Sequence, residues 1–258
     1  MPQTAIAIHN VEKWFGNQVH ALSECTLDIA DNEFAVLLGP SGCGKSTLLN
    51  IVAGFEDLTS GNVEVFGSPV VAPGPERTVV FQEPALFPWL TVWENVVFGP
   101  KMNGEAQAEY APRARALLES VGLAKFHEAL PHELSGGMKQ RVGIVRALVM
   151  NPRVLLMDEP FGALDAQTRL SMQELLLSVW ERQRKTVLFI THDIDEAILL
   201  ADRVHVMSAR PGQIAEMFPV DLPRPRGIDL LTDPEFNRLR GEIMRCIRTQ
   251  ANAALSAV

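Results

Sequence analysis

Hydrophobic and polar positions alternate through the first part of the chain. Residues 4–29 contain two segments of this kind, TAIAIHNV and ALSECTLDI, with a polar turn between them. Successive side chains of a strand point to opposite faces, so this alternation predicts antiparallel strands with one face in water. GNVEVFG, at 61–67, predicts another short strand bounded by glycines. The start of the chain therefore predicts a small antiparallel β subdomain.

Continuous apolar runs of strand length begin at residue 35. They are AVLL (35–38), TVVFQ (78–82), VLLMDE (154–159), TVLFIT (186–191) and RVHVMS (203–208). Runs without a polar face are typical of strands buried on both sides. Helical segments such as QTRLSMQELLLSVW lie between some of them. Strand–helix–strand alternation predicts an α/β fold with a parallel-sheet core.

Residues 83–150 predict an inserted helical subdomain. Prolines are expected to separate its helices, such as RARALLESVGL, and they are Pro84, Pro88, Pro100, Pro112 and Pro131. A further helix is expected to begin at Ser135 and to end before Pro152, because proline cannot continue a helix.

Residues 221–258 predict a helical extension. Asp233 is the expected N-cap, and Pro234 and Glu235 belong in a first helical turn. The apolar side of this helix is formed by Phe236, Leu239, Ile243 and Ile247. We therefore expect residues 1–220 to form one domain and residues 221–258 to pack back onto it.

Composition and charge exclude several protein classes. The chain has 258 residues, 47% of them hydrophobic and 21% charged, as in ordinary soluble globular proteins. No apolar run approaches the roughly 18 residues of a membrane span, and the amino-terminal residues do not resemble a secretory signal. A net charge of −8 argues against nucleic-acid binding through bulk positive charge. The three cysteines show no paired spacing, which suits a reducing cytosol.

A glycine-rich loop lies between the first continuous apolar run and a helix. It is Gly39-Pro40-Ser41-Gly42-Cys43-Gly44-Lys45-Ser46-Thr47, which fits the P-loop pattern. Glycines let backbone N–H groups turn inward around a phosphate, and the following helix directs its positive end at the same place. Lys45 is expected to reach the β- and γ-phosphates of ATP, and the Ser46 hydroxyl to bind Mg²⁺.

Two acids follow the apolar run VLLM. Asp158 and Glu159 are expected at the carboxyl end of that strand, where α/β folds bind their ligands. Asp158 would hold the Mg²⁺ shell, and Glu159 would activate water as a general base. Because adjacent residues of a strand point in opposite directions, the two carboxylates are expected to have different roles.

A second anion-binding helix end follows at Leu134-Ser135-Gly136-Gly137-Met138. Ser135 is its N-cap, and Gly136 and Gly137 leave the first turn uncovered. With this segment the sequence closely resembles the ATPase subunit of ATP-binding cassette (ABC) transporters, whose signature is LSGGQ-like. The resemblance covers nearly the whole chain, and Met138 is a mild departure from the signature. It implies a P-loop NTPase core of the RecA-like type.

The resemblance also assigns roles to further residues. Gln82 matches the Q-loop glutamine that senses Mg²⁺ and the γ-phosphate, and His192, in FITHD, matches the switch histidine. Ala163-Leu164-Asp165 matches the D-loop, with Asp165 near the nucleotide. Phe15 matches the aromatic residue that stacks on adenine, with Trp14 as the alternative ring.

Partners are likewise implied by the resemblance. In the family two subunits, here a homodimer or paired ATPase subunits, sandwich two ATP molecules, each Lys45 loop facing the other subunit's signature residues. Such subunits lie peripherally on the cytoplasmic face of the inner membrane, bound to an integral-membrane permease and served indirectly by a solute-binding protein. Residues 83–96, with Trp89, are either core of the helical subdomain or the surface on which the permease docks.

Three longer strings indicate the type of transporter. They are VVFQEPALFPWLTVWENVVFG, MDEPFGALDAQTR and THDIDEAILLADRVHVMSARPG, which look most like importers of the nitrate, sulfonate and taurine type. A soluble ABC-family ATPase that is not coupled to transport is the alternative. An unrelated P-loop kinase or GTPase would need neither the signature segment nor His192.

Overall fold

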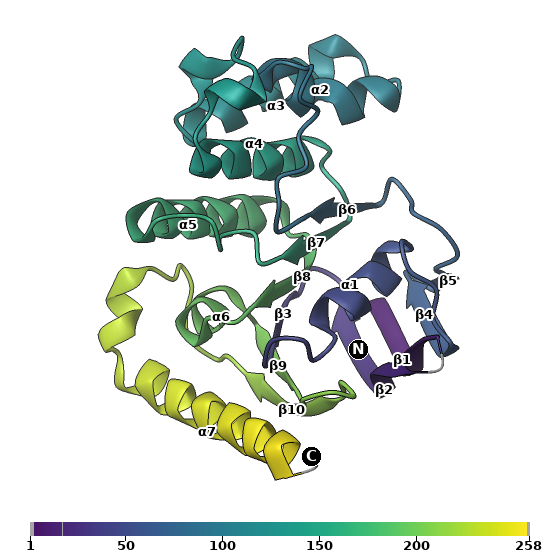
Figure 1. Ribbon diagram of the computed structural model, residues 1–258. Coiled ribbons are helices and arrows are strands. Elements are labelled where there is room, and N and C mark those ends of the chain that lie inside the picture. Colours follow the sequence, from purple (N-terminus) through teal and green to yellow (C-terminus); the bar gives the residue numbers. More distant parts are fainter. Residues whose placement is uncertain (1–2, 17, 257–258) are drawn as a thin grey trace.

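The computed structural model describes residues 3–16 and 18–256 of the chain (Figure 1). An antiparallel sheet near the amino terminus has the strand order β2-β1-β4-β5. Its strands are β1 (Thr4–Phe15), β2 (Val19–Ala30), β4 (Ser60–Val65) and β5 (Ser68–Pro69). Along the second half of β2 buried and exposed side chains alternate, so the expected antiparallel subdomain is confirmed.

A second sheet of six strands forms the centre of the molecule, in the order β10-β9-β3-β8-β7-β6. These strands are β3 (Phe34–Leu38), β6 (Arg77–Val80), β7 (Val154–Asp158), β8 (Thr186–Thr191), β9 (Arg203–Met207) and β10 (Ile214–Pro219). All neighbours pair in parallel except β9 and β10. The predicted parallel core is confirmed. The sequence does not predict β10, because its mixed polar and apolar residues form neither a continuous nor a strictly alternating pattern.

The two faces of this sheet bury separate cores. Phe34, Val36 and Leu38 of β3 pack into one hydrophobic cluster, and Ala35 and Leu37 into the other. The second cluster also takes side chains of the antiparallel sheet and of α1 (Lys45–Ala53), which lies between the two sheets in Figure 1. On the opposite face lie α5 (Ala166–Gln183) and α6 (Ile194–Leu200). The P-loop helix is therefore held between two sheets.

Helices follow one another in the stretch where the sequence predicts them. They are α2 (Val92–Met102), α3 (Gln107–Ser120) and α4 (Gly136–Val149), with short 3₁₀ turns at Ala124–Phe126 and Pro131–Glu133. Figure 1 shows them as a separate layer at the top of the molecule, which we call the helical layer. Pro100 and Pro112 lie inside α2 and α3, so the prediction that they separate helices is wrong. Pro100 is buried, and this packing offsets the hydrogen bond that it cannot make, whereas Pro112 is exposed.

The end of the chain forms a 3₁₀ turn at Ile228–Thr232 and the long helix α7 (Pro234–Ser256). The Asp233 carboxylate accepts hydrogen bonds from the N–H groups of Glu235 and Phe236, as expected of an N-cap. The Phe236, Leu239 and Ile243 side chains are buried against the rest of the chain, and Ile247 packs beside them. The division into domains at residue 220 stays a prediction, and residues 1, 2, 17, 257 and 258 lie outside the described residues.

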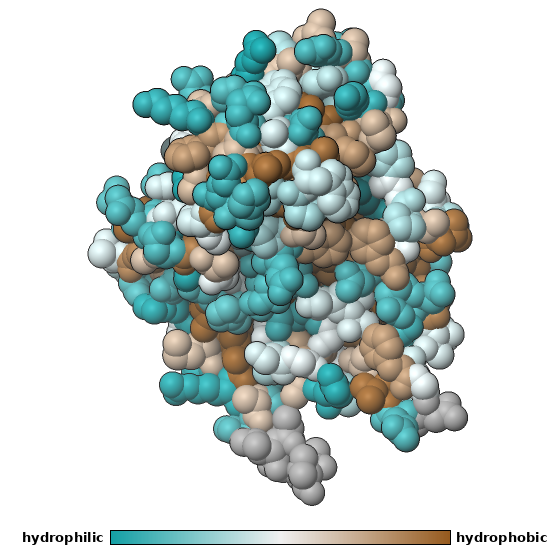
Figure 2. All heavy atoms as spheres, turned by 45° about the horizontal axis from the view of Figure 1, so that its top comes forward, coloured by the Kyte–Doolittle hydropathy of each residue, from teal (hydrophilic) through white to brown (hydrophobic). Residues whose placement is uncertain are grey.

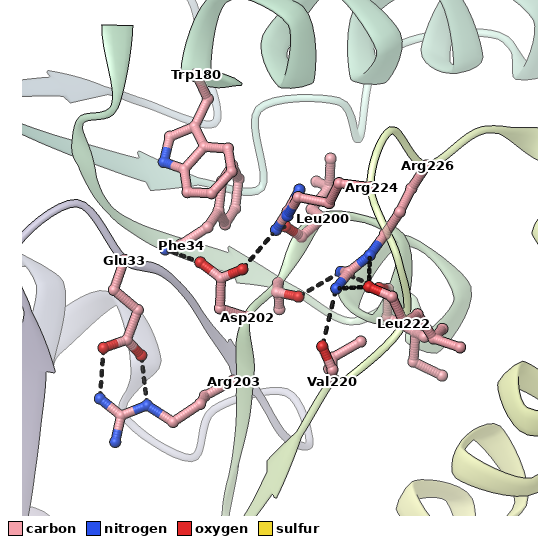
Figure 3. Close-up of polar contacts among 12 residues, drawn as sticks. Glu33, Phe34, Trp180, Leu200, Asp202, Arg203, Val220, Leu222, Arg224 and Arg226 are labelled. Atoms are coloured by element: carbon pink, nitrogen blue, oxygen red, sulfur yellow. Dashed lines mark hydrogen bonds and ion pairs between the residues drawn. The ribbon is translucent and has the colours of Figure 1, made fainter. Parts of the chain in front are cut away.

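Charged side chains tie the segment before α7 to the sheet (Figure 3). Asp202, just before β9, accepts a hydrogen bond from the Phe34 N–H group at 2.9 Å and another from Arg224 at 2.8 Å. The buried Arg226 guanidinium donates to four carbonyl oxygens, those of Ile198, Ala201, Val220 and Leu222. Burial lowers the pKa of Arg226 to about 10, so this group keeps its charge at neutral pH. These bonds fix the carboxyl end of α6.

Removing His205 should make the fold less sensitive to acid. Burial lowers the pKa of this β9 side chain from 6.5 to about 4, so between those values the unfolded chain binds more protons than the folded one. Stability should therefore fall with falling pH, by about 2 kcal/mol between pH 7 and pH 5 for this group. Urea unfolding at both pH values should show that this loss is smaller in His205→Leu. An equal loss in both proteins would contradict the assignment.

Candidate nucleotide-binding site

The loop Gly39–Thr47 joins β3 to α1 and leaves the helix end open. Gly44 is the N-cap of α1, and no side chain accepts a hydrogen bond there. With φ of 102°, Gly44 adopts a conformation that other residues rarely take. A Cβ at this position would lie 2.7 Å from Leu22 Cδ2. The loop is therefore packed tightly against β2, and the first N–H groups of α1 are free to bind an anion.

The turn between β9 and β10 packs against the loop Gly39–Thr47. A Cβ on Gly212 would lie 2.0 Å from the Cys43 carbonyl oxygen. The Gly212 N–H group donates to Ala21 O at 2.9 Å, and Gly212 O accepts from Ser23 N at 3.0 Å. The sequence pattern does not point to Gly212. The dipeptide Pro211-Gly212 signals a turn but not the loop, far away in the chain, against which it packs.

Lys45 lies inside the loop. Its side chain is buried, and its ammonium group donates to the carbonyl oxygens of Gly39 at 2.9 Å and Pro40 at 3.0 Å. The Cys43 thiol lies 3.8 Å away. Burial raises the pKa of this thiol, so Cys43 is a packing residue at neutral pH. The lysine is therefore held at the place where an anion bound by the loop would meet it.

Ser46 and Asp158 form a pair of oxygen donors. Burial raises the pKa of the Asp158 carboxyl, while a hydrogen bond with the Ser46 side chain and the nearby Lys45 charge act in the opposite direction. A half-buried carboxylate beside a hydroxyl is a donor set that suits Mg²⁺, whose charge would offset the cost of burial. Gln82, expected to sense Mg²⁺, is exposed and lies two residues beyond the end of β6, so the prediction that it ends the strand is wrong.

Glu159 and His192 meet at the ends of neighbouring strands. Asp158 and Ile190 are partners in the β7–β8 ladder, and the Glu159 N–H group donates to Ile190 O at 3.0 Å, so the segments that follow both strands lie close together. The His192 Nδ1 atom is 3.1 Å from the Glu159 Oε2 atom. Glu159 has a φ of 43°, a strained value for a residue with a side chain. This turn gives Glu159 a partner different from that of Asp158, consistent with separate roles.

The signature residues begin α4, which Figure 1 shows in the helical layer, apart from α1. Ser135 caps α4, and its hydroxyl accepts a hydrogen bond from Met138 N at 3.2 Å. A Cβ added to Gly136 would meet no atom within 4 Å, and one added to Gly137 would meet Leu164 at 3.4 Å. Asp165 caps α5 by accepting from Thr168 N, and this contact lowers the pKa of Asp165. Within residues 3–16 and 18–256, no hydrogen bond links Ser135–Gly137 to the loop Gly39–Thr47.

Two aromatic rings end β1. Trp14 stacks on His20 with ring centroids 4.0 Å apart and an angle of 7° between the planes. Phe15 is 42% exposed, with the Lys13 ammonium 4.8 Å from its ring centroid. Because Trp14 already has a stacking partner, Phe15 is the ring better placed to receive another flat group.

An apolar groove of about 430 Å³ lies between the helical layer and the central sheet. We call it the aromatic groove, and its lining includes Phe55, Phe81, Phe87, Phe98, Arg77 and Arg146. Figure 2 shows hydrophobic side chains on the surface below the helical layer. Trp89 lies beside Phe87 at 5.7 Å between ring centroids and is 71% exposed. Val92 and Val96 are buried, and Leu90 is half-buried.

None of the helices among the described residues is long and apolar enough to cross a membrane.

Known proteins resemble this chain over most of its length. The family model described as ABC transporter matches residues 22–162. A taurine import ATP-binding protein, TauB, of Rhizobium johnstonii is 50% identical over 89% of each chain. A nitrate import ATP-binding protein, NrtD, of Synechocystis sp. is 46% identical over 93% of this chain and 92% of its own.

Solved structures of ABC transporter cassettes resemble this chain in fold. The dimeric structure of MJ0796, a bacterial ABC transporter cassette, has a TM-score of 0.76 and 32% identity, covering 84% of this chain and all of its own. A dimer of the same cassette in a post-hydrolysis state, bound to ADP and Pi, has a TM-score of 0.75 and 31% identity over the same shares.

Gly212→Ala should weaken nucleotide binding although Gly212 lies far from the loop in sequence. The added methyl group would overlap the Cys43 carbonyl and displace the loop, at a cost of about 1–3 kcal/mol. We expect a dissociation constant for a fluorescent ATP analogue raised about tenfold or more. Gly227→Ala is the matched control, because nothing lies within 4 Å of its Cβ position. Equal affinities for both variants would contradict the packing argument.

Proposed function

The chain belongs to the ABC transporter family, and we propose that it is the ATP-hydrolysing subunit of an importer for a small anionic or zwitterionic solute. Nitrate, sulfonates and taurine are the solutes proposed, because relatives at 46–50% identity are named for nitrate and taurine import. A separate permease would carry the solute. The observation that supports ATP hydrolysis best is the joint position of Lys45, Ser46, Asp158, Glu159 and His192 at one edge of the parallel sheet.

Binding of ATP is assigned to the loop Gly39–Thr47. The uncapped N–H groups at the start of α1 would hold the phosphates, and Lys45 would exchange its carbonyl contacts for phosphate oxygens. Ser46, Asp158 and Gln82 would hold Mg²⁺, which when bound supplies positive charge to the phosphate oxygens. Phe15 would stack on the adenine ring.

Hydrolysis is assigned to Glu159. Its carboxylate would accept a proton from the water that attacks the γ-phosphate. His192, at 3.1 Å, would hold this carboxylate in place and contact the γ-phosphate with its other ring nitrogen. Gln82 begins the segment that leads to the aromatic groove. A change in its position when Mg²⁺ and the γ-phosphate bind would therefore change the conformation of that surface.

The full site is proposed to need two subunits. Ser135, Gly136 and Gly137 form an open helix end that does not reach the loop of their own chain. In a dimer, each such end would meet the ATP held by the other subunit, with Asp165 near it. The dimeric cassettes with TM-scores of 0.75–0.76 support this arrangement.

The aromatic groove and Trp89 are proposed as the docking surface for the permease. A ring that is 71% exposed next to a groove lined by phenylalanines is costly in water unless a partner covers it. Arg146 fixes the adjoining loop by donating to the Pro84 and Ala85 carbonyl oxygens. Docking would place the subunit peripherally on the cytoplasmic face of the inner membrane, with a solute-binding protein on the opposite side delivering the solute.

Glu159→Gln should trap the ATP-bound dimer. The amide cannot accept the proton of the attacking water, but it keeps the size and the contact to His192. We expect turnover at least about 100-fold lower and a stable dimer in Mg-ATP by size-exclusion chromatography.

Glu174→Gln, on the exposed side of α5, is the control and should behave as the parent. If Glu159→Gln hydrolyses ATP at the parent rate, Glu159 is not the base.

Trp89→Ala should release the subunit from membranes. Loss of a central aromatic contact typically weakens an interface by about 2 kcal/mol or more, which corresponds to about 30-fold. The fraction of tagged protein recovered with native membranes should fall, together with any multispan permease identified by mass spectrometry. ATP binding should not change.

Met217→Ala, exposed on the edge strand β10 at the opposite side of the central sheet from β6, is the control. A parent subunit that is recovered only with soluble partners would favour an ATPase that is not coupled to transport.

A further inference from the structure

Arg169 lies where two functional segments meet. It is in the first turn of α5, directly after the D-loop residues Ala163–Asp165. Its guanidinium donates to the Leu164 carbonyl oxygen at 3.2 Å and lies 3.7 Å from the Asp193 carboxylate. Asp193 follows His192 in the chain. One side chain therefore bridges the D-loop and the segment that carries the switch histidine.

Asp193 is itself held firmly in the fold. Its carboxylate caps α6 by accepting from Glu196 N at 3.1 Å, and its own N–H group donates to Thr191 Oγ1 at 3.0 Å. The carboxyl end of α6 is fixed by Arg226, as described above. Because Asp193 is held in this way, a displacement of Arg169 would also displace the start of α6 and His192.

The contacts on the other side of Arg169 lead to the signature. Leu164, whose carbonyl binds the guanidinium, is the residue that Gly137 faces. A continuous line of contacts thus runs from Gly137 through Leu164, Arg169 and Asp193 to His192, which contacts Glu159 at 3.1 Å. Arg169 also lines a cavity of about 40 Å³ shared by Glu159 and His192.

An arginine suits this position better than a lysine. Its planar group can direct N–H donors at two partners at once, whereas an ammonium group acts as a single point charge. The ion pair with Asp193 is about one third exposed on both sides, so it contributes little to the stability of the fold. Arg169 would therefore matter for the position of its partners and not for the stability of the fold.

We propose that Arg169 is a positioning residue that couples the two half-sites of each subunit. The signature and the D-loop face the partner's ATP, whereas Glu159 and His192 act on the subunit's own ATP. Arg169 would hold these two groups of residues in a fixed position relative to each other. The inference rests on the proposed function, since it needs ATP hydrolysis at Glu159 and a dimer with two composite sites.

The test measures steady-state ATP hydrolysis by the full chain with Arg169→Met. We expect kcat to fall about 10- to 100-fold, as for a misplaced catalytic group, with KM for ATP within about twofold of the parent. The Hill coefficient for ATP should fall towards 1, because the two sites would no longer be linked. The melting temperature should stay within about 4 °C of the parent value.

Three further variants separate positioning from a general structural effect. Arg169→Lys keeps the charge but not the fork, so its kcat should lie between those of the parent and Arg169→Met. Asp193→Asn keeps the cap of α6 and removes the ion pair, and combining it with Arg169→Met should add little to the loss. Arg182→Met, exposed at the other end of α5, is the matched control and should have the parent kcat.

The outcomes are distinguishable from a failure of the proposed function. If Glu159→Gln is inactive but Arg169→Met keeps the kcat and Hill coefficient of the parent, the coupling proposal alone is wrong. Strictly additive losses in the double variant would also overturn it. If Glu159→Gln itself hydrolyses ATP at the parent rate, both proposals are overturned.

Discussion

The parallel pairing of β3, β8 and β7 is the constraint on which the site depends. In this ladder Leu38 is the partner of Thr191, and Ile190 is the partner of Asp158. The residues that follow these strands are the P-loop, His192 and Glu159, so three segments far apart in sequence begin at one edge of the sheet. Continuous apolar strands, buried on both faces, hold this edge rigid.

The site also depends on the close approach of two backbone segments to the loop Gly39–Thr47. Gly44 and Gly212 let β2 and the turn after β9 touch the loop Gly39–Thr47 from two sides. The loop is therefore held by backbone contacts from two sides, and the start of α1 has no side-chain cap. The antiparallel sheet thus has a role beyond stability, because it supports the loop and also ends at Phe15, the ring proposed to stack on adenine.

Much of this arrangement could be predicted from the sequence, because local patterns encode it. Apolar runs identified five strands of the central sheet, the glycine spacing identified the loop, and Ser135 and Asp233 are helix caps as expected. Contacts between distant segments could not be predicted in this way. The support by Gly212, the bonds of Arg226 and the bridge made by Arg169 depend on tertiary packing, which no periodicity records. Pro100 shows the same limit, since it is packed inside α2 despite its local preference.

The central claim is that each subunit carries two half-sites that become complete only across a dimer. The most direct measurement is cross-linking of the double variant Ser41→Cys/Ser135→Cys with a flexible bis-maleimide. Both positions are exposed, while Cys25, Cys43 and Cys246 are buried, so the reagent should react at the new thiols. We predict a cross-link between two subunits that forms in Mg-ATP and not without nucleotide. A variant that binds ATP but forms no cross-link between subunits would contradict the account.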